Sequence, residues 1–374
     1  MTLPSTPHSE HIPLFKPFVA AHAAENVRAV LDSGYIGEGP KVKEFEAALE
    51  HLLDAPVLTV NSGTSAIHLA LDLAGINRGD WVVSTPMTCI ATNVCVLQRG
   101  AHIAWADVDP STGLIDPADA YHMLRAMDAK AILAVDYGGL PCDYEAIAYY
   151  TALGGASAIL DAAHSLLTML TDSTGTYVHN HHHMDYTCYS FQAIKHLTTG
   201  DGGGLICPPH KREEARRKRW FGLDRSLGGF RCEQEVKELG YKFHMNDIAA
   251  AIGLANIESV EDVVTIAREN AAYYHAALAD LPITLPPLNP DASWWLYTIL
   301  VPNRELFIRD MEDRGIQCAK PHSRNDVNPI FRLYHRNLPG VEKFDSRQVA
   351  IPVGWWVTPT LRERIATTIH EVLR

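Results

Sequence analysis

Short, almost wholly apolar runs alternate with helical stretches through the first half of the chain. The runs lie at 57–62, 81–86, 102–108, 129–137 and 156–163. Strands that are apolar on both faces are typical of a parallel sheet covered by helices on both sides. The pattern predicts an α/β domain with a mostly parallel central sheet. In such sheets, functional residues gather beyond the carboxyl ends of the strands.

The pattern changes near residue 246. From 246 to 281, small and apolar residues recur at helical spacing, which predicts one long connecting helix or two helices that meet near Ser259. Shorter strand-like and helical segments follow at 294–301, 305–314, 316–321, 348–353 and 359–373. A chain of 374 residues is long enough for two domains. We expect a large domain over 1–248, with 1–12 as a loose arm, and a smaller C-terminal α+β domain over 249–374.

The charge balance and the cysteines exclude several classes of protein. The net charge is −12, and the one basic cluster, 211–219, is interrupted by two glutamates, so we expect a solvated helix face and no nucleic acid partner. No run approaches the roughly 20 apolar residues that cross a membrane, and the start does not resemble a signal peptide, so we expect a cytoplasmic protein. Seven scattered cysteines without a CxxC pair argue against a disulfide framework and a structural zinc site.

Two residues at strand ends are candidates for chemistry. Lys195 follows the predicted strand 186–191, in a loop that continues into threonines and glycines. A lysine that is partly desolvated there has a lowered pKa and a free amine that can condense with a carbonyl. Asp161 ends an apolar strand, where a carboxylate needs a partner such as a protonated pyridine nitrogen. Taken singly, Lys195 is better explained as a solvated surface lysine. Asp161 is explained equally well as the N-cap of a helix.

A third segment, 61–71, runs from a strand through a Gly-Thr-Ser turn into a helix. The exposed N–H groups of a helix N-terminus, together with the hydroxyls of Thr64 and Ser65, make a natural seat for a phosphate. An ordinary capped helix has the same pattern, so this segment is suggestive only in combination with the other two.

A phosphate seat, a buried aspartate and a lysine loop, in that order, are the outline of fold-type I enzymes that use pyridoxal 5'-phosphate (PLP). The chain resembles the DegT/DnrJ/EryC1/StrS family of PLP-dependent sugar aminotransferases over nearly its whole length. The segments that carry the resemblance are 12–17, 33–46, 60–71, 105–117, 159–165, 190–203 and 240–258. The resemblance implies an aspartate aminotransferase-like fold with a large PLP-binding domain and a smaller C-terminal domain.

The resemblance also implies roles for individual residues. Lys195 would bind the cofactor covalently and shuttle a proton during amino transfer, and Asp161 would pair with the pyridine nitrogen. His164 stands where the family places a residue that hydrogen-bonds the phenolic oxygen. The phosphate would be held by Gly63, Thr64, Ser65 and Ser190.

Two positions depart from the family pattern. Cys89 lies in the segment 85–92, where family members usually carry an aromatic ring that stacks on the cofactor. A thiol can cover the ring but offers less area. Lys242 stands in 240–244, where the family commonly has an asparagine that reaches the phosphate of the neighbouring subunit. If Lys242 does so as a point charge, the active site requires a homodimer with shared sites.

Two weaker candidates remain. The histidine-rich run 179–185 invites a metal interpretation, but we expect a solvated loop there and predict no metal. His322 and Arg324 lie in the predicted small domain and could contact the carboxylate of the amino donor or a sugar diphosphate. For Arg324, a salt bridge within the loop is at least as good an explanation.

The predicted function is transfer of an amino group from L-glutamate to a keto-sugar, specifically a nucleotide-linked 3-keto or 4-keto deoxysugar, in amino-sugar biosynthesis for surface polysaccharides or natural products. One alternative is amination of a keto-cyclitol with glutamine as the donor. Another is the related dehydratase chemistry, against which Lys195 argues because the family's dehydratases have histidine there. The last is a regulatory protein that binds PLP without catalysis.

Overall fold

A computed structural model describes residues 11–225, 227 and 233–374 of the chain. Most of the predicted N-terminal arm, residues 1–10, and Cys232 lie outside the described residues. Ile12 does not fit the predicted arm, because its side chain is buried and its backbone bonds to Gly315 and Gln317. Including residue 12 in a loose arm was therefore wrong; its apolar side chain belongs to the core of the C-terminal region.

The predicted mostly parallel sheet is confirmed. Its seven strands stand in the order β1-β9-β8-β5-β4-β2-β3. They are β1 (Leu58–Val60), β2 (Trp81–Ser84), β3 (His102–Trp105), β4 (Ala131–Val135), β5 (Ser157–Asp161), β8 (Tyr186–Ser190) and β9 (Gly203–Ile206). Only β9 runs against its neighbours β1 and β8, while the other pairings are parallel. The short strands β6 (Met169–Thr171) and β7 (Tyr177–His179) form a separate hairpin.

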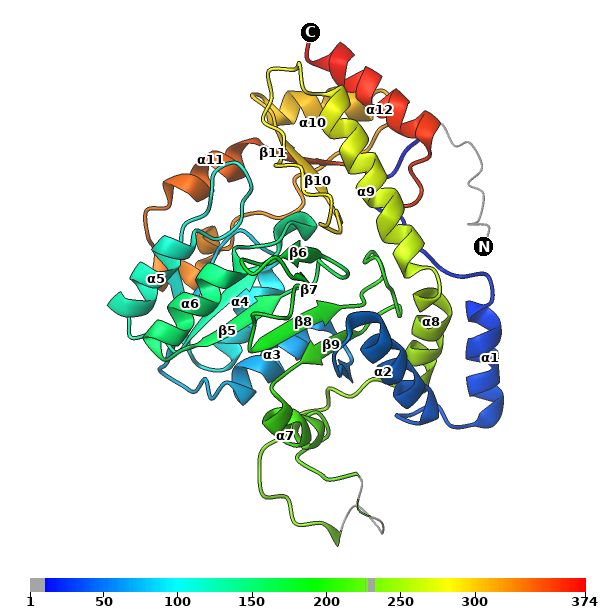
Figure 1. Ribbon diagram of the computed structural model, residues 1–374, viewed down its shortest axis with the longest axis vertical. Coiled ribbons are helices and arrows are strands. Elements are labelled where there is room, and N and C mark those ends of the chain that lie inside the picture. The colour runs from blue at the N-terminus through cyan, green and yellow to red at the C-terminus, as the bar shows by residue number, and fades with distance from the viewer. Residues whose placement is uncertain (1–10, 226, 228–232) are drawn as a thin grey trace.

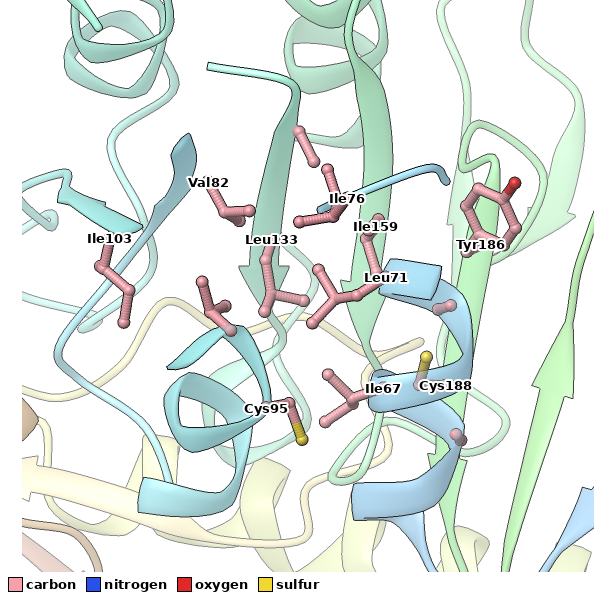
Figure 2. Close-up of a cluster of buried hydrophobic side chains, with 14 of the residues drawn as sticks. Ile67, Leu71, Ile76, Val82, Cys95, Ile103, Leu133, Ile159, Tyr186 and Cys188 are labelled. Carbon is pink, nitrogen blue, oxygen red and sulfur yellow. The ribbon is translucent and has the colours of Figure 1, made fainter. Parts of the chain in front are cut away.

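Helices cover both faces of the sheet, as the two-sided apolar strands predict. In β4, Ala131 and Leu133 belong to one hydrophobic cluster and Ile132 and Ala134 to another, so alternate side chains fill the cores on opposite faces. Figure 2 shows part of the first cluster, where side chains of two helices meet those of the strands. The helices of this region are α1 (Ala23–Ser33), α2 (Pro40–Leu53), α3 (Gly63–Leu73), α4 (Ile90–Gln98), α5 (Pro117–Ala126), α6 (Tyr144–Gly154) and α7 (Arg212–Lys218), with η1 (Tyr137–Gly139) and η2 (Pro209–Lys211) as 3₁₀ turns.

The connecting segment consists of two helices, α8 (Asp247–Ile257) and α9 (Val260–Ala277), which meet at Ser259 as the second alternative predicted. In Figure 1, α9 runs from α8 to the end of the molecule where α10 and α12 lie. The remaining elements are β10 (Tyr297–Leu300), α10 (Arg304–Glu312), η4 (Asn325–Val327), η5 (Pro329–Tyr334), α11 (Pro339–Arg347), β11 (Gln348–Ile351) and α12 (Pro359–Val372). Strands β10 and β11 form an antiparallel pair. The segment 316–321 is not a full strand and makes only isolated bridges.

The packing bears on where the two predicted domains divide. Helix α8 packs on α1 and α2, whereas α9 packs on α12. The boundary at 248/249 stays a prediction. Within the described part of the chain, no helix combines the length and apolar character needed to span a membrane.

Candidate active site

Three predicted site segments meet at one edge of the sheet. Asp161 is the last residue of β5, Ser190 is the last of β8, and Ser62 follows β1 by two residues. Strand β1 runs parallel to β8 because both are antiparallel to β9. The carboxyl ends of these strands therefore lie together, which is where ligands bind in open α/β sheets.

Lys195 lies in the loop after β8, with its amine against an aromatic face. Its Nζ is 3.5 Å from the ring centroid of Trp295. Burial lowers the pKa of Lys195 to about 7, and the neighbouring side chains of Asp161 and Cys89 act in the opposite direction. About half of the amines are then unprotonated at neutral pH, which is the form that attacks a carbonyl carbon. Trp295 had not been identified as a site residue, because its segment has the pattern of an ordinary buried strand.

Asp161 is buried and receives hydrogen bonds from neutral donors. The Thr92 hydroxyl donates to Oδ2 at 2.6 Å, and the backbone N–H of Ala163 donates to Oδ1 at 3.1 Å. Burial raises the pKa of Asp161, while these two bonds and the charge of Lys195 act in the opposite direction. A carboxylate so placed attracts a cation. Thr92, in the first turn of α4, was also missed; its hydroxyl lies 2.8 Å from that of Thr88, which precedes the helix.

The rings of His164, His322 and Trp295 lie near Lys195. The His164 ring stacks on Trp295 with centroids 3.9 Å apart and lies parallel to His322 at 5.4 Å. Burial lowers the pKa of His164 well below its ordinary value and that of His322 to about 4, and the positive charge of Lys195 lowers both further. Both imidazoles are therefore neutral at pH 7. The Nε2 of His322 is buried and has no hydrogen-bond partner in the described structure.

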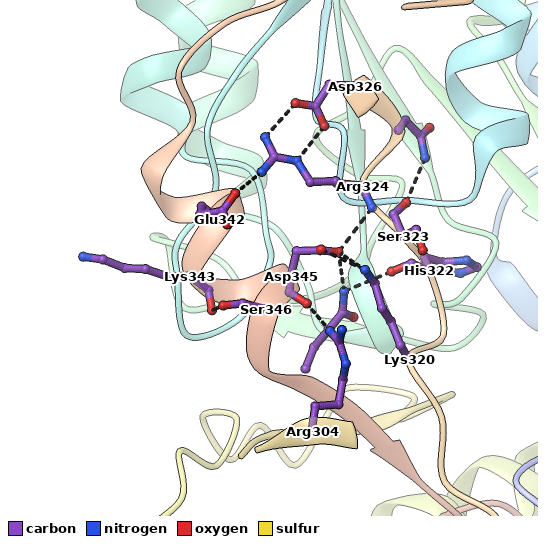
Figure 3. A network of polar contacts seen from close by, with 12 residues as sticks. Arg304, Lys320, His322, Ser323, Arg324, Asp326, Glu342, Lys343, Asp345 and Ser346 are labelled. Atoms are coloured by element: carbon purple, nitrogen blue, oxygen red, sulfur yellow. Dashed lines mark hydrogen bonds and ion pairs between the residues drawn. The ribbon is translucent and has the colours of Figure 1, made fainter. Parts of the chain in front are cut away.

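Arg324, the other predicted substrate residue, directs its guanidinium to acidic side chains of its own region. Its guanidinium pairs with both carboxylate oxygens of Asp326, at 2.8 and 2.7 Å, and also with Glu342, while its backbone N–H donates to Asp345 (Figure 3). The structure brings His322 to the lysine but places Arg324 in a loop ion pair. These contacts match the salt-bridge explanation for Arg324 and give its predicted substrate contact no support.

The predicted phosphate seat forms the start of α3. Ser62 caps the helix, accepting a hydrogen bond from the Ser65 N–H at 3.1 Å. The Ser65 hydroxyl donates to Asn61 Oδ1 at 2.6 Å and accepts from the Ser62 hydroxyl at 3.0 Å, so one of its lone pairs is left to accept a further hydrogen bond. The sequence pattern identified Thr64 and Ser65 but missed the cap, although serine is among the preferred N-cap residues.

Gly63 is required for the close approach of β8 to the seat. A Cβ atom on Gly63 would lie 2.9 Å from the Cβ of Ser190, closer than packed carbon atoms come. The amides of Gly63 and Thr64 open the helix and precede its first internal hydrogen bonds. The Ser190 hydroxyl thus lies beside N–H groups that suit an anion.

Cys89 and Lys242 border the site. Cys89 directly precedes α4, and its partly exposed side chain is close enough to Lys195 to influence that amine. The Lys242 carbonyl accepts a hydrogen bond from Asn61 at 3.1 Å, but its Nζ lies 3.6 Å from the ring centroid of Trp220. Within its own chain, the Lys242 ammonium therefore rests on an aromatic ring.

The histidine-rich run 179–185 is not simply a solvated loop. It begins at the end of β7, and Asn180 is 1% exposed. The Asn180 amide donates to Ser165, and the Tyr189 hydroxyl donates to Asn180 at 2.6 Å. The prediction of a solvated loop is therefore corrected at Asn180, which fixes the run to the core, while His182 and Asp185 are exposed.

Comparison with known proteins agrees with this geometry. The chain is similar to AtS13 from Actinomadura melliaura, with 38% identity, a TM-score of 0.91 and coverage of 98% of this chain and 100% of that one. It is also similar to the sugar aminotransferase CalS13 from Micromonospora echinospora, with 33% identity, a TM-score of 0.91 and coverage of 96% and 99%. The aminotransferase TlmJ from Streptoalloteichus hindustanus shares 26% identity, with a TM-score of 0.89 and coverage of 97% and 99%.

The sequence model of the DegT/DnrJ/EryC1/StrS aminotransferase family matches residues 18–370. That match covers nearly the whole chain, including every predicted cofactor residue at the sheet edge. It agrees with the resemblance found from the sequence and with the fold-type I architecture. The protein is an aminotransferase that belongs to the DegT/DnrJ/EryC1/StrS family.

Proposed function

We propose that this protein uses PLP to transfer an amino group from L-glutamate to a keto-sugar carried on a nucleotide. The observation that carries the proposal is the placement of Lys195 and Asp161 at one sheet edge, beside a helix N-terminus. The sugar substrate is supported by the similarity to a protein described as a sugar aminotransferase. Glutamate, the nucleotide and the 3-keto or 4-keto position rest on the family resemblance.

The residues present fit PLP in three respects. Asp161 is buried with only neutral hydrogen-bond donors, which leaves it free to hold a protonated pyridine nitrogen. The helix start at Gly63 and Thr64, with Ser190 against it, suits a phosphate. The lowered pKa of Lys195 suits covalent attachment to an aldehyde.

Each residue then has a defined task. Bound PLP supplies an electron sink for the carbanion formed at the donor's α-carbon. Lys195, once displaced by the amino donor, has an unprotonated amine that can take the α-proton and return it. Asp161 would hold the proton on the pyridine nitrogen of bound PLP. His164 and His322 are neutral, so each can donate one hydrogen bond and accept another without adding charge.

The proposal includes a homodimer. An apolar groove with a cavity volume of about 410 Å³ lies between α1 and the lysine loop, lined by Pro17, Val19, Ala23, Ala24, Val27, Ala193, Thr198, Gly200 and Ile252. A second copy would cover this groove, which includes Ala193 and Thr198 on either side of Lys195 in the sequence. Lys242 would then leave Trp220 and reach the phosphate seat of the partner.

The test begins with the purified protein loaded with PLP. Addition of L-glutamate should change the absorbance of the bound cofactor and release 2-oxoglutarate, and a keto-sugar nucleotide should restore the original spectrum. A panel that varies the nucleotide and the keto position identifies the acceptor.

Lys195→Ala is the decisive variant. It should lose both the absorbance of the covalently held cofactor and all turnover, while Lys237→Ala, at a side chain that is 79% exposed, should lose neither. Undiminished turnover in the Lys195→Ala protein would refute the proposal. A wild-type protein that binds PLP but never responds to an amino donor would indicate a binding protein instead.

A further inference from the structure

Three potential metal ligands converge away from the active-site residues described above. Glu145 lies in the first turn of α6, Asp172 directly follows β6, and His183 lies in the turn after β7. We call these residues the Glu145–Asp172–His183 cluster. Each offers one ligand atom, and these atoms all lie within 4.8 Å of one another. Among the residues described by the structure, no other three His, Cys, Asp or Glu side chains come together in this way.

The ligand atoms of the cluster lie close to one another, although Glu145 Oε1 also accepts a hydrogen bond from the Ser173 N–H. The Nε2 of His183 is buried, has no hydrogen-bond partner and lies 4.0 Å from Glu145 Oε1. Asp172 uses Oδ1 to accept hydrogen bonds from Thr174 and Thr176, which fixes the carboxylate and leaves Oδ2 available. An imidazole nitrogen that is shielded from water and faces two carboxylates lacks the partner that a buried polar atom normally has.

We propose that the Glu145–Asp172–His183 cluster binds one divalent transition-metal ion of the Zn²⁺ class. Zinc accepts imidazole nitrogen and carboxylate oxygen at about 2.0–2.2 Å in tetrahedral geometry, which places neighbouring ligand atoms about 3.4 Å apart. The present spacing requires each side chain to move inward by only about 1 Å, and all three are partly exposed and so able to adjust. Mg²⁺ and Ca²⁺ favour all-oxygen sites, so the imidazole argues against them.

The bound ion would join three separate parts of the fold. It would tie the β6–β7 hairpin and the turn after it to α6. The same hairpin is bonded to Asp291, through Met169 N–H to its carbonyl at 3.0 Å and the Tyr177 hydroxyl to its carboxylate at 2.8 Å. The chain continues from Asp291 to Trp295, whose ring contacts the Lys195 amine. The ion would therefore stabilise a segment behind the active site, and this proposal differs from our expectation from sequence that the run 179–185 binds no metal.

The test is calorimetric titration of the PLP-loaded protein with ZnCl₂ after removal of metals by a chelator. We expect one ion per chain and a rise in melting temperature. His183→Ala should weaken binding at least about 100-fold, since even loss of an outer-shell partner costs 10–100-fold. Asp172→Asn and Glu145→Gln should also weaken binding, and Asp172→Asn keeps the Oδ1 acceptor that the hairpin turn requires.

Two histidines serve as matched controls. His182, exposed in the same turn, and His210, exposed beside α7, should both tolerate replacement by alanine with zinc affinity unchanged. Zinc binding that persists in His183→Ala and Asp172→Asn would show that the ion binds elsewhere, for example at the cofactor, and would overturn the proposal. Failure of the wild-type protein to bind zinc would overturn it too. Neither result depends on turnover, so the proposed aminotransferase function is tested separately.

Discussion

The lowered pKa of Lys195 predicts how its reactivity depends on pH. Burial is the main cause of the shift to about 7, because water no longer solvates the ammonium form. Trp295 covers the amine on one side, with Nζ 3.5 Å from the ring centroid. The Asp161 carboxylate acts in the opposite direction and keeps the pKa from falling further.

The size of the effect follows from the pKa difference. At pH 8, a lysine with a pKa near 7 is about 90% unprotonated, against about 0.4% for an ordinary lysine, an advantage of about 200-fold. The same pKa shift lowers the stability of the cofactor-free fold. Between about pH 7 and 10.4, Lys195 is protonated in the unfolded chain but mostly unprotonated in the folded protein. Burial of Lys195 therefore destabilises the fold fully below about pH 7, and this cost is relieved as the pH rises toward 10.4.

The assay labels the cofactor-free protein with a small uncharged aldehyde, traps the product by reduction and measures modification of each lysine by peptide mass spectrometry. The rate at Lys195 should be half-maximal near pH 7. Lys237, which is 79% exposed, is the internal reference for a solvated amine. Access and intrinsic nucleophilicity scale the plateau of such a profile but leave its midpoint unchanged. Asp161→Asn should shift the midpoint of Lys195 to lower pH, since the charge that favours the ammonium form is lost.

A midpoint for Lys195 near pH 10 in the wild-type protein would refute this reasoning. So would a midpoint that moves upward in Asp161→Asn, because that carboxylate would then not face the amine. A protein whose Lys195 is unreactive at every pH would show that the amine is closed off rather than deprotonated.

The other predictions concern the phosphate seat and the side chains that contact Asp161 and Lys195. Gly63→Ala should destabilise the fold by about 1–3 kcal/mol in denaturant titration, because its Cβ meets Ser190, and adding Ser190→Gly should recover part of the loss. Thr92→Val removes a hydrogen bond to a carboxylate worth about 1.5–3 kcal/mol, so the pKa of Asp161 should rise and the acid limb of the pH–rate profile should move up by about 1–2 units. Trp295→Ala should lower stability by about 3–5 kcal/mol and weaken PLP retention, while Trp295→Phe keeps an aromatic face and should retain most of both.

The sheet and the positions of Lys195 and Asp161 could be predicted because local pattern determines them. A strand such as β4, with Ile132 and Leu133 buried on opposite faces, must lie between two layers of helices. A charged residue at the end of such a strand can only emerge at the edge where the other parallel strands end. No knowledge of the loops is needed for that step.

Trp295 and Thr92 could not be predicted in the same way. Trp295 contacts Lys195 from 100 positions further along the chain, and Thr92 reaches Asp161 across 69 positions. Their contacts depend on how the C-terminal region and α4 pack on the sheet, which the local pattern does not specify. Arg324 is a different case, because its bidentate partner Asp326 lies only two positions away and the sequence already offered a salt bridge within the loop.

The charges around Lys195 bear on how a substrate with phosphate groups is held. His164 and His322 are neutral at pH 7, and Arg324 is neutralised by Asp326 and Glu342. Among the described residues placed at this site, the amine of Lys195 is thus the main source of positive charge, yet it is needed for proton transfer. A diphosphate must therefore find cations outside this group. In the proposed homodimer, Lys242 of a second subunit would supply one next to the helix start.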